Sequence, residues 1–324
     1  MSERPIGVLV MAYGTANGPG DIERYYTDIR GGRPPSAEHL QELVERYAAI
    51  GNVFPLLDST RAQAEGLVAE LNAGAGEERF RAYLGMKHSP PFIPEGVARM
   101  REDGIEHAVA IVMAPHWSGM SVGSYIERVT QAVNGDGGGP ECSFVRSFHD
   151  HPAFVELLAG RVDEAMGRLP PEERDGAVVI FSAHSLPVRV LSDGSERCLR
   201  CDCADSCLYR DGLLETGELV AKHLGLEFWT IAWQSAGRTA DPWWGPSLDG
   251  VIEQVAVEGH PAVIVCSAGF VADHLETLYD LDIEARALSE EAGLRFERTE
   301  MPNADPEFCR VLARVVRDHL AEEV

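Results

Sequence analysis

The chain has 324 residues, of which 45% are hydrophobic and 25% are charged. This length suits about two folded domains, and the composition argues against disorder. The 28 lysines and arginines are outnumbered by 52 aspartates and glutamates, which gives a net charge of −24. Such a charge disfavours nucleic-acid binding, which requires neutralisation of phosphates, and docking on anionic lipid, but it is compatible with a protein that handles cations.

The N-terminal segment enters an apolar run of strand length at once, and it is too short and too acidic for a signal peptide. No run of about 18 apolar residues is present, so we expect no transmembrane helix. We therefore expect a cytosolic protein.

Apolar runs of strand length alternate with longer stretches of helical pattern along the whole chain. Most of the runs are continuous rather than alternating, which is typical of parallel strands buried on both faces. The predicted strands comprise residues 6–13, 80–87, 108–114, 143–148, 177–181, 229–233, 262–266 and 296–301. The predicted helices comprise residues 37–50, 60–71, 93–103, 152–167, 212–224, 248–257 and 305–322. This alternation predicts an α/β fold with parallel sheets.

The predicted strands fall into two sets of four, with the division between residues 150 and 175. This pattern predicts two doubly wound domains, each a four-stranded parallel sheet flanked by helices. We assign residues 1–155 to the first domain and residues 156–304, with a cysteine-rich insertion at 195–210, to the second. The last helix, within residues 305–324, could pack back on the first domain.

Polar and aromatic side chains follow several predicted strands, at the edge where open parallel sheets bind ligands. Tyr13, His88, His116 and His184 each lie at the end of an apolar run or directly after it. A single histidine at such a place is more often structural, but three that converge on one edge favour a site. The glycines of residues 14–20 fit neither common phosphate-binding loop, so nucleotide chemistry is disfavoured.

Residues 269–284, with the sequence GFVADHLETLYDLDIE, carry three carboxylates on one helical face, because Glu276, Asp280 and Glu284 are spaced four residues apart. Like charges at this spacing weaken a helix. One interpretation is a solvated acidic face in an acidic protein. The other is a ladder of carboxylates that strips and relays a hydrated divalent cation.

Four cysteines, Cys198, Cys201, Cys203 and Cys207, crowd into ten residues. In a reducing compartment this cluster indicates metal binding rather than disulfides. Four thiolates at this spacing suit either one tetrahedral zinc ion or a small iron–sulfur cluster, and the spacing alone does not separate the two.

Several motifs along the chain resemble those of the ferrochelatase family. The most specific are SAHSLP at residues 182–187 and GFVADHLETLY at residues 269–279. The others follow the order of the family and lie at residues 10–15, 21–30, 87–88, 114–116, 121–125, 233–239 and 242–246. The resemblance implies two Rossmann-like chelatase domains and an enzyme that inserts Fe²⁺ into a porphyrin.

The resemblance also implies roles for individual residues. His184 matches the family's catalytic histidine, and Glu276 matches the carboxylate that faces this histidine across the porphyrin. The segment around Tyr13 resembles that of the ferrochelatases of monoderm bacteria that act on coproporphyrin III. In that branch this tyrosine can ligate the product iron. The residues that match contacts to the porphyrin carboxylates are Arg30, Arg46, Tyr47 and Tyr125.

Two positions depart from that branch. Phe54, a further candidate contact to the porphyrin, stands where the branch often has a serine. Gly31 stands where a second arginine often follows Arg30. Both departures bear on the choice of porphyrin.

Metalation removes two pyrrole protons and inserts a partly dehydrated Fe²⁺ ion. We hypothesise that a neutral His184 accepts the first proton or ligates the iron, with Glu276 assisting. Asp280 and Glu284 would relay cations or protons. Aromatic side chains would grip the ring, and Trp233 and Trp244 are among the candidates.

The resemblance favours a 2Fe–2S cluster over zinc at the four cysteines, because some ferrochelatases hold such a cluster with internally grouped ligands. The expected product, Fe-coproporphyrin III (coprohaem), belongs to haem b biosynthesis, and the decarboxylase that consumes it is the expected transient partner. We expect a monomer. The alternatives are a protoporphyrin IX ferrochelatase, which Tyr13 and the arginines disfavour, and a non-catalytic haem-binding or iron–sulfur sensor protein, which the intact His184 and Glu276 disfavour.

Overall fold

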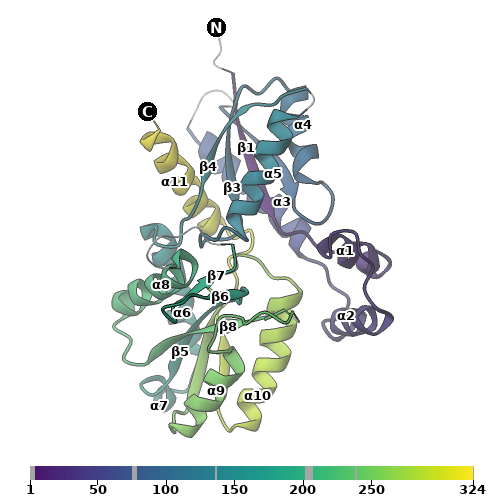
Figure 1. Ribbon diagram of the computed structural model, residues 1–324. Coiled ribbons are helices and arrows are strands. Elements are labelled where there is room, and N and C mark those ends of the chain that lie inside the picture. The colour runs from purple at the N-terminus through teal and green to yellow at the C-terminus, as the bar shows by residue number, and fades with distance from the viewer. Residues whose placement is uncertain (1–3, 75–78, 136, 201–206, 238, 324) are drawn as a thin grey trace.

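The computed structural model describes residues 4–74, 79–135, 137–200, 207–237 and 239–323. Two four-stranded parallel sheets, each flanked by helices, lie one above the other in Figure 1. This arrangement confirms the predicted α/β fold with two parallel sheets. Among the helices of the described residues, none combines the length and the hydropathy that a membrane span requires.

The first sheet has the strand order β2-β1-β3-β4. Its central strand β1 is buried on both faces: Val8 and Val10 join the core beneath helix α3, whereas Leu9 and Met11 join the core beneath helix α4. This burial explains why the run is continuously apolar. The elements of this half are β1 (Ile6–Ala12), α3 (Leu56–Asn72), β2 (Phe80–Met86), α4 (Ile93–Glu102), β3 (His107–Val112), α5 (Val122–Asn134) and β4 (Glu141–Val145).

The second sheet has the strand order β10-β9-β5-β8. Val178 and Ile180 of its strand β5 pack toward helix α9, and Val179 and Phe181 pack toward the opposite face. The elements of this half are α6 (Pro152–Arg168), α7 (Pro171–Arg174), β5 (Val178–His184), α8 (Leu208–Leu224), β8 (Trp229–Gln234), α9 (Leu248–Val257), β9 (Ala262–Cys266), α10 (Arg286–Glu291) and β10 (Arg295–Arg298).

The final helix α11 (Pro306–Glu322) follows the second sheet in sequence but runs beside the first, as Figure 1 shows. It packs on α3 and α6, and Phe308 and Leu312 enter a buried cluster that extends to both sheets. Arg317 Nη2 donates a hydrogen bond to the carbonyl oxygen of Glu70 on α3, at 2.6 Å. One continuous core therefore joins the two sheets.

Several local elements were not expected from the apolar pattern. Helix α1 (Ile22–Ile29) was not expected although its apolar residues recur at helical spacing. Strands β6 (Val188–Val190) and β7 (Glu196–Cys198) have three residues each and are too short to show a period. The expected helix at residues 269–284 forms only in part, as the π-helix η2 (Thr277–Ala285) followed by α10. The remaining elements are η1 (Pro19–Asp21) and α2 (Ala37–Ala49).

Two helical glycines provide a test of the packing. A Cβ atom at Gly96 of α4 would lie 2.4 Å from the carbonyl oxygen of Leu84, whereas one at Gly160 of α6 would meet nothing within 4 Å. We expect Gly96→Ala to lower the free energy of unfolding by about 1–3 kcal/mol through overpacking. Gly160→Ala should raise it by about 0.5–1 kcal/mol, because alanine loses less backbone entropy in a helix. Urea unfolding of the two variants measures both effects, and equal changes would contradict the packing described.

Candidate active site

The candidate site is centred on His184, at the carboxyl end of β5, and Glu276, which precedes η2. His184 Nε2 lies 3.5 Å from Oε1 of Glu276, and His274 Nε2 lies 3.5 Å from its Oε2. The other ring nitrogen of His184, Nδ1, donates a hydrogen bond to the carbonyl oxygen of Ser185. This bond fixes the direction of the ring, so that Nε2 faces the carboxylate.

The charges of this pair stabilise each other. Burial disfavours the imidazolium of His184, but the adjacent Glu276 carboxylate outweighs this cost and raises the pKa of His184 to about 9. Burial also opposes ionisation of Glu276, yet His184 and His274 hold the pKa of its carboxyl well below its usual range. The carboxylate therefore favours the protonated form of His184. The sequence did not reveal how close this carboxylate lies, and the neutral proton acceptor stays a prediction.

Tyr13 follows β1 and belongs to the same site. It keeps 42% of its surface exposed, and its ring centroid lies 4.6 Å from that of His88. Enclosure by the protein and the charge of Glu276 together raise the pKa of Tyr13 well above its usual value. Tyr13 is thus an accessible phenol within electrostatic reach of the His184–Glu276 pair.

Asp280 and Glu284, but not Glu276, contact helix α2 through an arginine. Arg46 of α2 places Nη2 2.8 Å from Oδ1 of Asp280 and 3.4 Å from Oε2 of Glu284, and its guanidinium lies 4.4 Å from the ring centroid of Tyr279. Burial and the charge of Glu276 raise the pKa of Asp280 to about 6. The π-helical winding, which is rare and frequently found at functional sites, corrects the expected α-helix.

The other residues expected to contact the porphyrin differ in how far their side chains are exposed to solvent. Tyr47 is buried and stacks on Phe54 with ring centroids 4.6 Å apart. Tyr125 is also buried, beneath the amino group of Lys87, which lies 5.1 Å from its ring centroid. Arg30 is exposed and lies over the ring of Tyr26.

The expected convergence of three strand-end histidines is wrong for His116. It is buried, and its Nε2 lies 3.0 Å from the hydroxyl of Thr216 on α8 rather than near His184. Its ring lies against that of His149, with centroids 5.3 Å apart. The position of His116 at a strand end did not predict its burial, because the burial is due to helix α8, which covers it.

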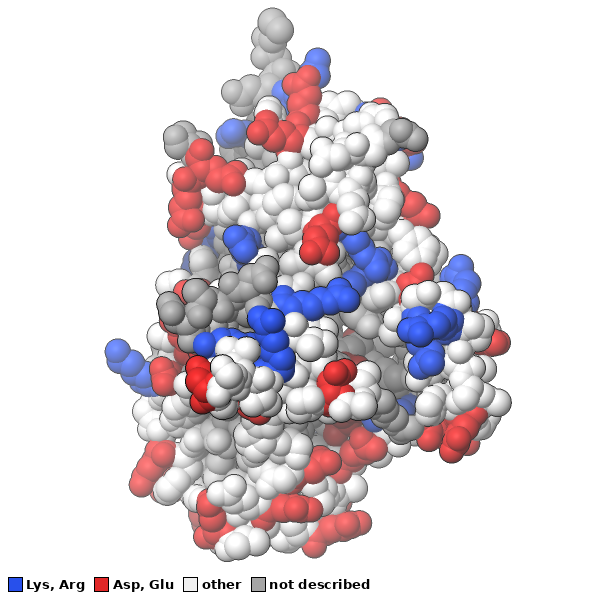
Figure 2. Space-filling view, in the orientation of Figure 1, with Lys and Arg blue, Asp and Glu red and all other residues white. Residues whose placement is uncertain are grey.

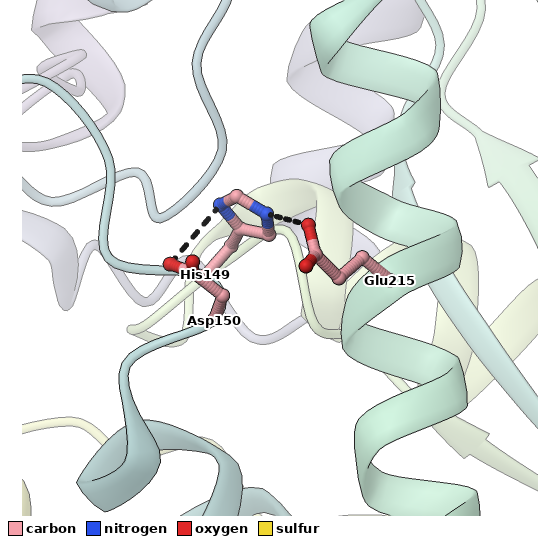
Figure 3. Close-up of side chains that lie close together, drawn as sticks. All are labelled: His149, Asp150 and Glu215. Atoms are coloured by element: carbon pink, nitrogen blue, oxygen red, sulfur yellow. Dashed lines mark hydrogen bonds and ion pairs between the residues drawn. The ribbon is translucent and has the colours of Figure 1, made fainter.

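His149 has carboxylates on two sides, as Figure 3 shows. Glu215 Oε2 on α8 lies 3.1 Å from Nε2 of His149, and Asp150 Oδ1 lies 3.8 Å from Nδ1. The two carboxylates approach different nitrogens of the ring, but one oxygen of each and one ring nitrogen all lie within 4.8 Å of one another. Nδ1 of His149 also lies 2.6 Å from the hydroxyl oxygen of Ser147. These contacts tie α8 to the chain after β4.

Two of the four clustered cysteines lie in the described part of the chain. Cys198 and Cys207 are buried, with their sulfur atoms 3.2 Å apart, and Trp244 Nε1 donates a hydrogen bond to Cys198 Sγ at 3.3 Å. This contact between the two thiols lowers the pKa of Cys207 and raises that of Cys198. Cys201 and Cys203 lie outside the described residues.

Trp233 and Trp244 were candidates to grip the ring, but both are almost fully buried, with 2% and 4% of their surfaces exposed. They stack on each other with ring centroids 6.1 Å apart. Their place is therefore behind the candidate site rather than in it.

Known proteins match this chain over essentially its whole length. The family model described as ferrochelatase matches residues 5–320. A coproporphyrin III ferrochelatase of Anoxybacillus flavithermus is 45% identical over 324 residues, which cover 100% of this chain and 99% of that relative. A relative of the same name from Bacillus subtilis is 44% identical over 317 residues, which cover 98% of each chain.

Solved structures with little sequence similarity share the fold. SirB from Bacillus subtilis with Fe³⁺ superposes with a TM-score of 0.61 at 10% identity, over 99% of this chain and 97% of that one. CbiX, titled the terminal enzyme for biosynthesis of sirohaem in denitrifying bacteria, gives a TM-score of 0.53 at 12% identity, over 96% of this chain and 98% of that one.

The raised pKa of Asp280 predicts a pH-dependent stability. Because the folded carboxyl titrates near pH 6 and an unfolded one near pH 4, the folded state holds more protons between these values, and the wild type loses stability as the pH rises. Asp280→Asn lacks this loss. Its free energy of unfolding relative to the wild type should therefore increase by about 2 kcal/mol between pH 4 and pH 7. Urea unfolding in a metal chelator measures this; a constant or falling difference would contradict it.

Proposed function

Because the chain belongs to the ferrochelatase family, we propose that it inserts Fe²⁺ into coproporphyrin III and releases Fe-coproporphyrin III, within haem biosynthesis. The relatives that carry the name coproporphyrin III ferrochelatase match it over essentially their full length. The observation that carries the proposal is the His184–Glu276 pair within electrostatic reach of Tyr13. A histidine–carboxylate pair can hold and release a proton, and a phenol oxygen can ligate iron, and both suit the metalation of coproporphyrin III.

His184 and Glu276 are the proposed catalytic residues and contacts for the substrate iron. Glu276 is held ionised, so it can draw the metal ion or a pyrrole proton. A divalent cation near Glu276 would weaken its attraction for the proton on His184 and so lower the pKa of that histidine. The imidazole could then accept a pyrrole proton. Iron arrival and porphyrin deprotonation are thereby linked through one carboxylate.

Asp280 and Glu284 are the proposed relay to this pair. Asp280 is buried and half-neutralised near pH 6, so it can both take up and release a proton at physiological pH. In the substrate-free protein both carboxylates contact Arg46. A cation that uses this path must therefore compete with the guanidinium.

Positive side chains gather where a polyanionic substrate would need them. Figure 2 shows Lys and Arg in a band across the middle of one face, at the level of β6 and β7 in Figure 1, with Asp and Glu dominant below. Lys87 lies near Arg128 and Arg200, and burial together with their charges lowers its pKa to about 8. Clustered cations on a protein of net charge −24 favour a ligand with several carboxylates.

We assign the porphyrin contacts to Tyr13, Arg30, Arg46, Tyr47, Phe54 and Tyr125. Arg30 and Arg46 can pair with carboxylates, and the buried Tyr47 and Tyr125 offer hydroxyl groups. Coproporphyrin III has four carboxylates and protoporphyrin IX has two. The second candidate, protoporphyrin IX as substrate, is favoured by Phe54, which offers an apolar ring where the related branch often has a serine.

A 2Fe–2S cluster is the proposed occupant of Cys198, Cys201, Cys203 and Cys207, with zinc as the alternative. The described cysteines fit such a centre, because their sulfurs are 3.2 Å apart and an indole N–H donates to one of them. The cluster would supply structural cross-linking and redox sensitivity, since metalation itself transfers no electron.

The proposed partner follows from the proposed product. A decarboxylase that converts Fe-coproporphyrin III into haem b must receive it, and we propose a transient contact between that enzyme and a monomeric chelatase. Direct transfer would limit the release of a reactive iron porphyrin.

The choice of porphyrin is tested by anaerobic Fe²⁺ insertion into coproporphyrin III and protoporphyrin IX side by side. We expect kcat/KM for coproporphyrin III to be higher by on the order of tenfold or more, because the two extra carboxylates can form charge-assisted contacts. Rising salt concentration should narrow the difference in kcat/KM between the two porphyrins, because it screens charge contacts. A preference for protoporphyrin IX would establish the second candidate instead.

The role of His184 is tested by His184→Ala. The rate of insertion should fall by on the order of a hundredfold or more, because the proton acceptor is lost, while metal-free coproporphyrin still quenches the protein's fluorescence with nearly unchanged affinity. His260→Ala is the matched control, since its ring also bonds a carbonyl oxygen, that of Gly176 at 2.9 Å, away from the site. Near-normal turnover in the His184 variant would refute the assignment.

A further inference from the structure

The segment that leads into Glu276 has no regular secondary structure. Residues 267–274 connect the end of β9 to the helical turn that carries Glu276, and they form neither helix nor strand. The carbonyl oxygen of Val271 accepts from the backbone N–H of Asn303 at 3.0 Å, and the N–H of Asp273 donates to Asn303 Oδ1 at 2.8 Å. Asn303 Nδ2 donates back to Asp273 Oδ2 at 2.8 Å. A single residue beyond β10 therefore holds this segment at two points.

The same segment is also held from the other half of the molecule. Gln63 of α3 is fully buried, and its Nε2 donates to the carbonyl oxygens of Val271 at 3.0 Å and of Asn303 at 2.8 Å. Because carbonyl oxygens only accept, the amide nitrogen must face them, and Oε1 of Gln63 has no partner among the described residues. A buried acceptor without a partner is unfavourable. An apolar side chain would avoid this penalty, so the two donated bonds are what a glutamine contributes here.

Helix α3 also covers the strand that leads to Tyr13. It packs on β1, and Leu67, one turn after Gln63, shares a buried cluster with Val10. Packed interiors of this kind are stiff. Gln63 therefore relates the place of Glu276 in the second half of the molecule to that of Tyr13 in the first.

We propose that Gln63 and Asn303 are positioning residues that place Glu276 against His184 and fix it relative to the first half of the molecule. Both act through residues 271–273, which lie three to five residues before Glu276. Without their bonds this segment can shift, and the Glu276 carboxylate then leaves its place 3.5 Å from His184 Nε2. The inference names further residues for the reaction of the proposed function, and it rests on that function for its kinetic test.

The kinetic test is Gln63→Met, which nearly keeps the volume of the side chain and removes both donors. The proposed porphyrin contacts all lie between Tyr13 and Tyr125, in the first half of the chain, so coproporphyrin should still bind. We expect kcat for Fe²⁺ insertion to fall by on the order of tenfold, with KM for coproporphyrin III changed less than about twofold. An unchanged kcat, or a loss that lies mainly in KM, would overturn the proposal.

Asn303→Gly tests the second residue without adding backbone strain. Asn303 has a φ of +46°, in the left-handed region that glycine adopts freely. The variant keeps the backbone bond to Val271 and loses the two side-chain bonds to Asp273, so kcat should again fall with KM nearly unchanged. Because both variants act through one segment, the double variant should lose less than the product of the two single losses. Multiplicative losses would show two independent effects and contradict the proposal.

The matched control is Asn72→Leu on the same helix. Asn72 Nδ2 donates to the carbonyl oxygen of Phe80, and Asn72 Oδ1 accepts from the N–H groups of Arg79 and Phe80, each at 3.0 Å. These bonds also join α3 to another segment, but at the amino end of β2, away from the site. Urea unfolding should show a loss of stability, whereas kcat should stay within about twofold of the wild type. A fall in kcat as large as that of Gln63→Met would mean general destabilisation, and the proposal would fail.

A second readout does not depend on turnover. In substrate-free protein labelled with ¹⁵N-histidine and held at one pH, the ring signals of His184 and His274 can be assigned by their absence in the alanine variants. Both rings lie 3.5 Å from the Glu276 carboxylate, so both signals should move in Gln63→Met. The signal of His260, whose ring bonds a carbonyl oxygen away from the site, should stay in place.

The outcomes of this readout separate the two proposals. Signals of His184 and His274 that stay in place in Gln63→Met overturn the inference, and so does a His260 signal that moves with them. A wild type without chelatase activity would refute the proposed function, while the ring signals still decide whether Gln63 positions Glu276.

Discussion

The ion pair between His184 and Glu276 is the interaction on which the candidate site depends. Neither charge would be favourable alone in its half-buried position, because desolvation penalises an isolated imidazolium or carboxylate. At 3.5 Å each charge stabilises the other, which raises the pKa of the histidine and lowers that of the glutamate. The pair also joins the end of β5 to the start of η2. Its geometry therefore requires the second sheet to be correctly formed.

Several acidic side chains lie close together around this pair, and an arginine partly neutralises them. Burial and, after it, repulsion from the nearby Glu276 carboxylate raise the pKa of Asp280. Arg46 offsets part of this repulsion from helix α2, in the other half of the molecule. The contact between α2 and η2 thus links the two halves through charge. Any metal ion or substrate carboxylate that enters must exchange with these existing contacts.

Much of the fold follows from local patterns. The strands were predictable within a few residues because burial on both faces requires continuous apolar runs, as in Val8–Met11 of β1. Helices α2, α4, α6, α9 and α11 followed from apolar spacing for the same reason. The motifs around His184 and Glu276 indicated the family, because a reaction that needs a histidine and a carboxylate at set positions leaves a recognisable sequence. The β6–β7 hairpin was not predicted because its strands are too short to show a period, and helices α1 and α5 were not predicted although their apolar residues recur at helical spacing.

The sequence by itself determined the alternation of strands and helices, the family and the chemical groups available. Only the tertiary structure decided which groups meet. It paired Arg46 with Asp280, 234 residues away, removed His116 from the site by packing it against Thr216, and set the Trp244 indole on Cys198. It also raised the pKa of His184, since a pKa depends on the distance to the nearest charge. These outcomes are set by separations in space between residues distant in the chain, and no local pattern records such separations.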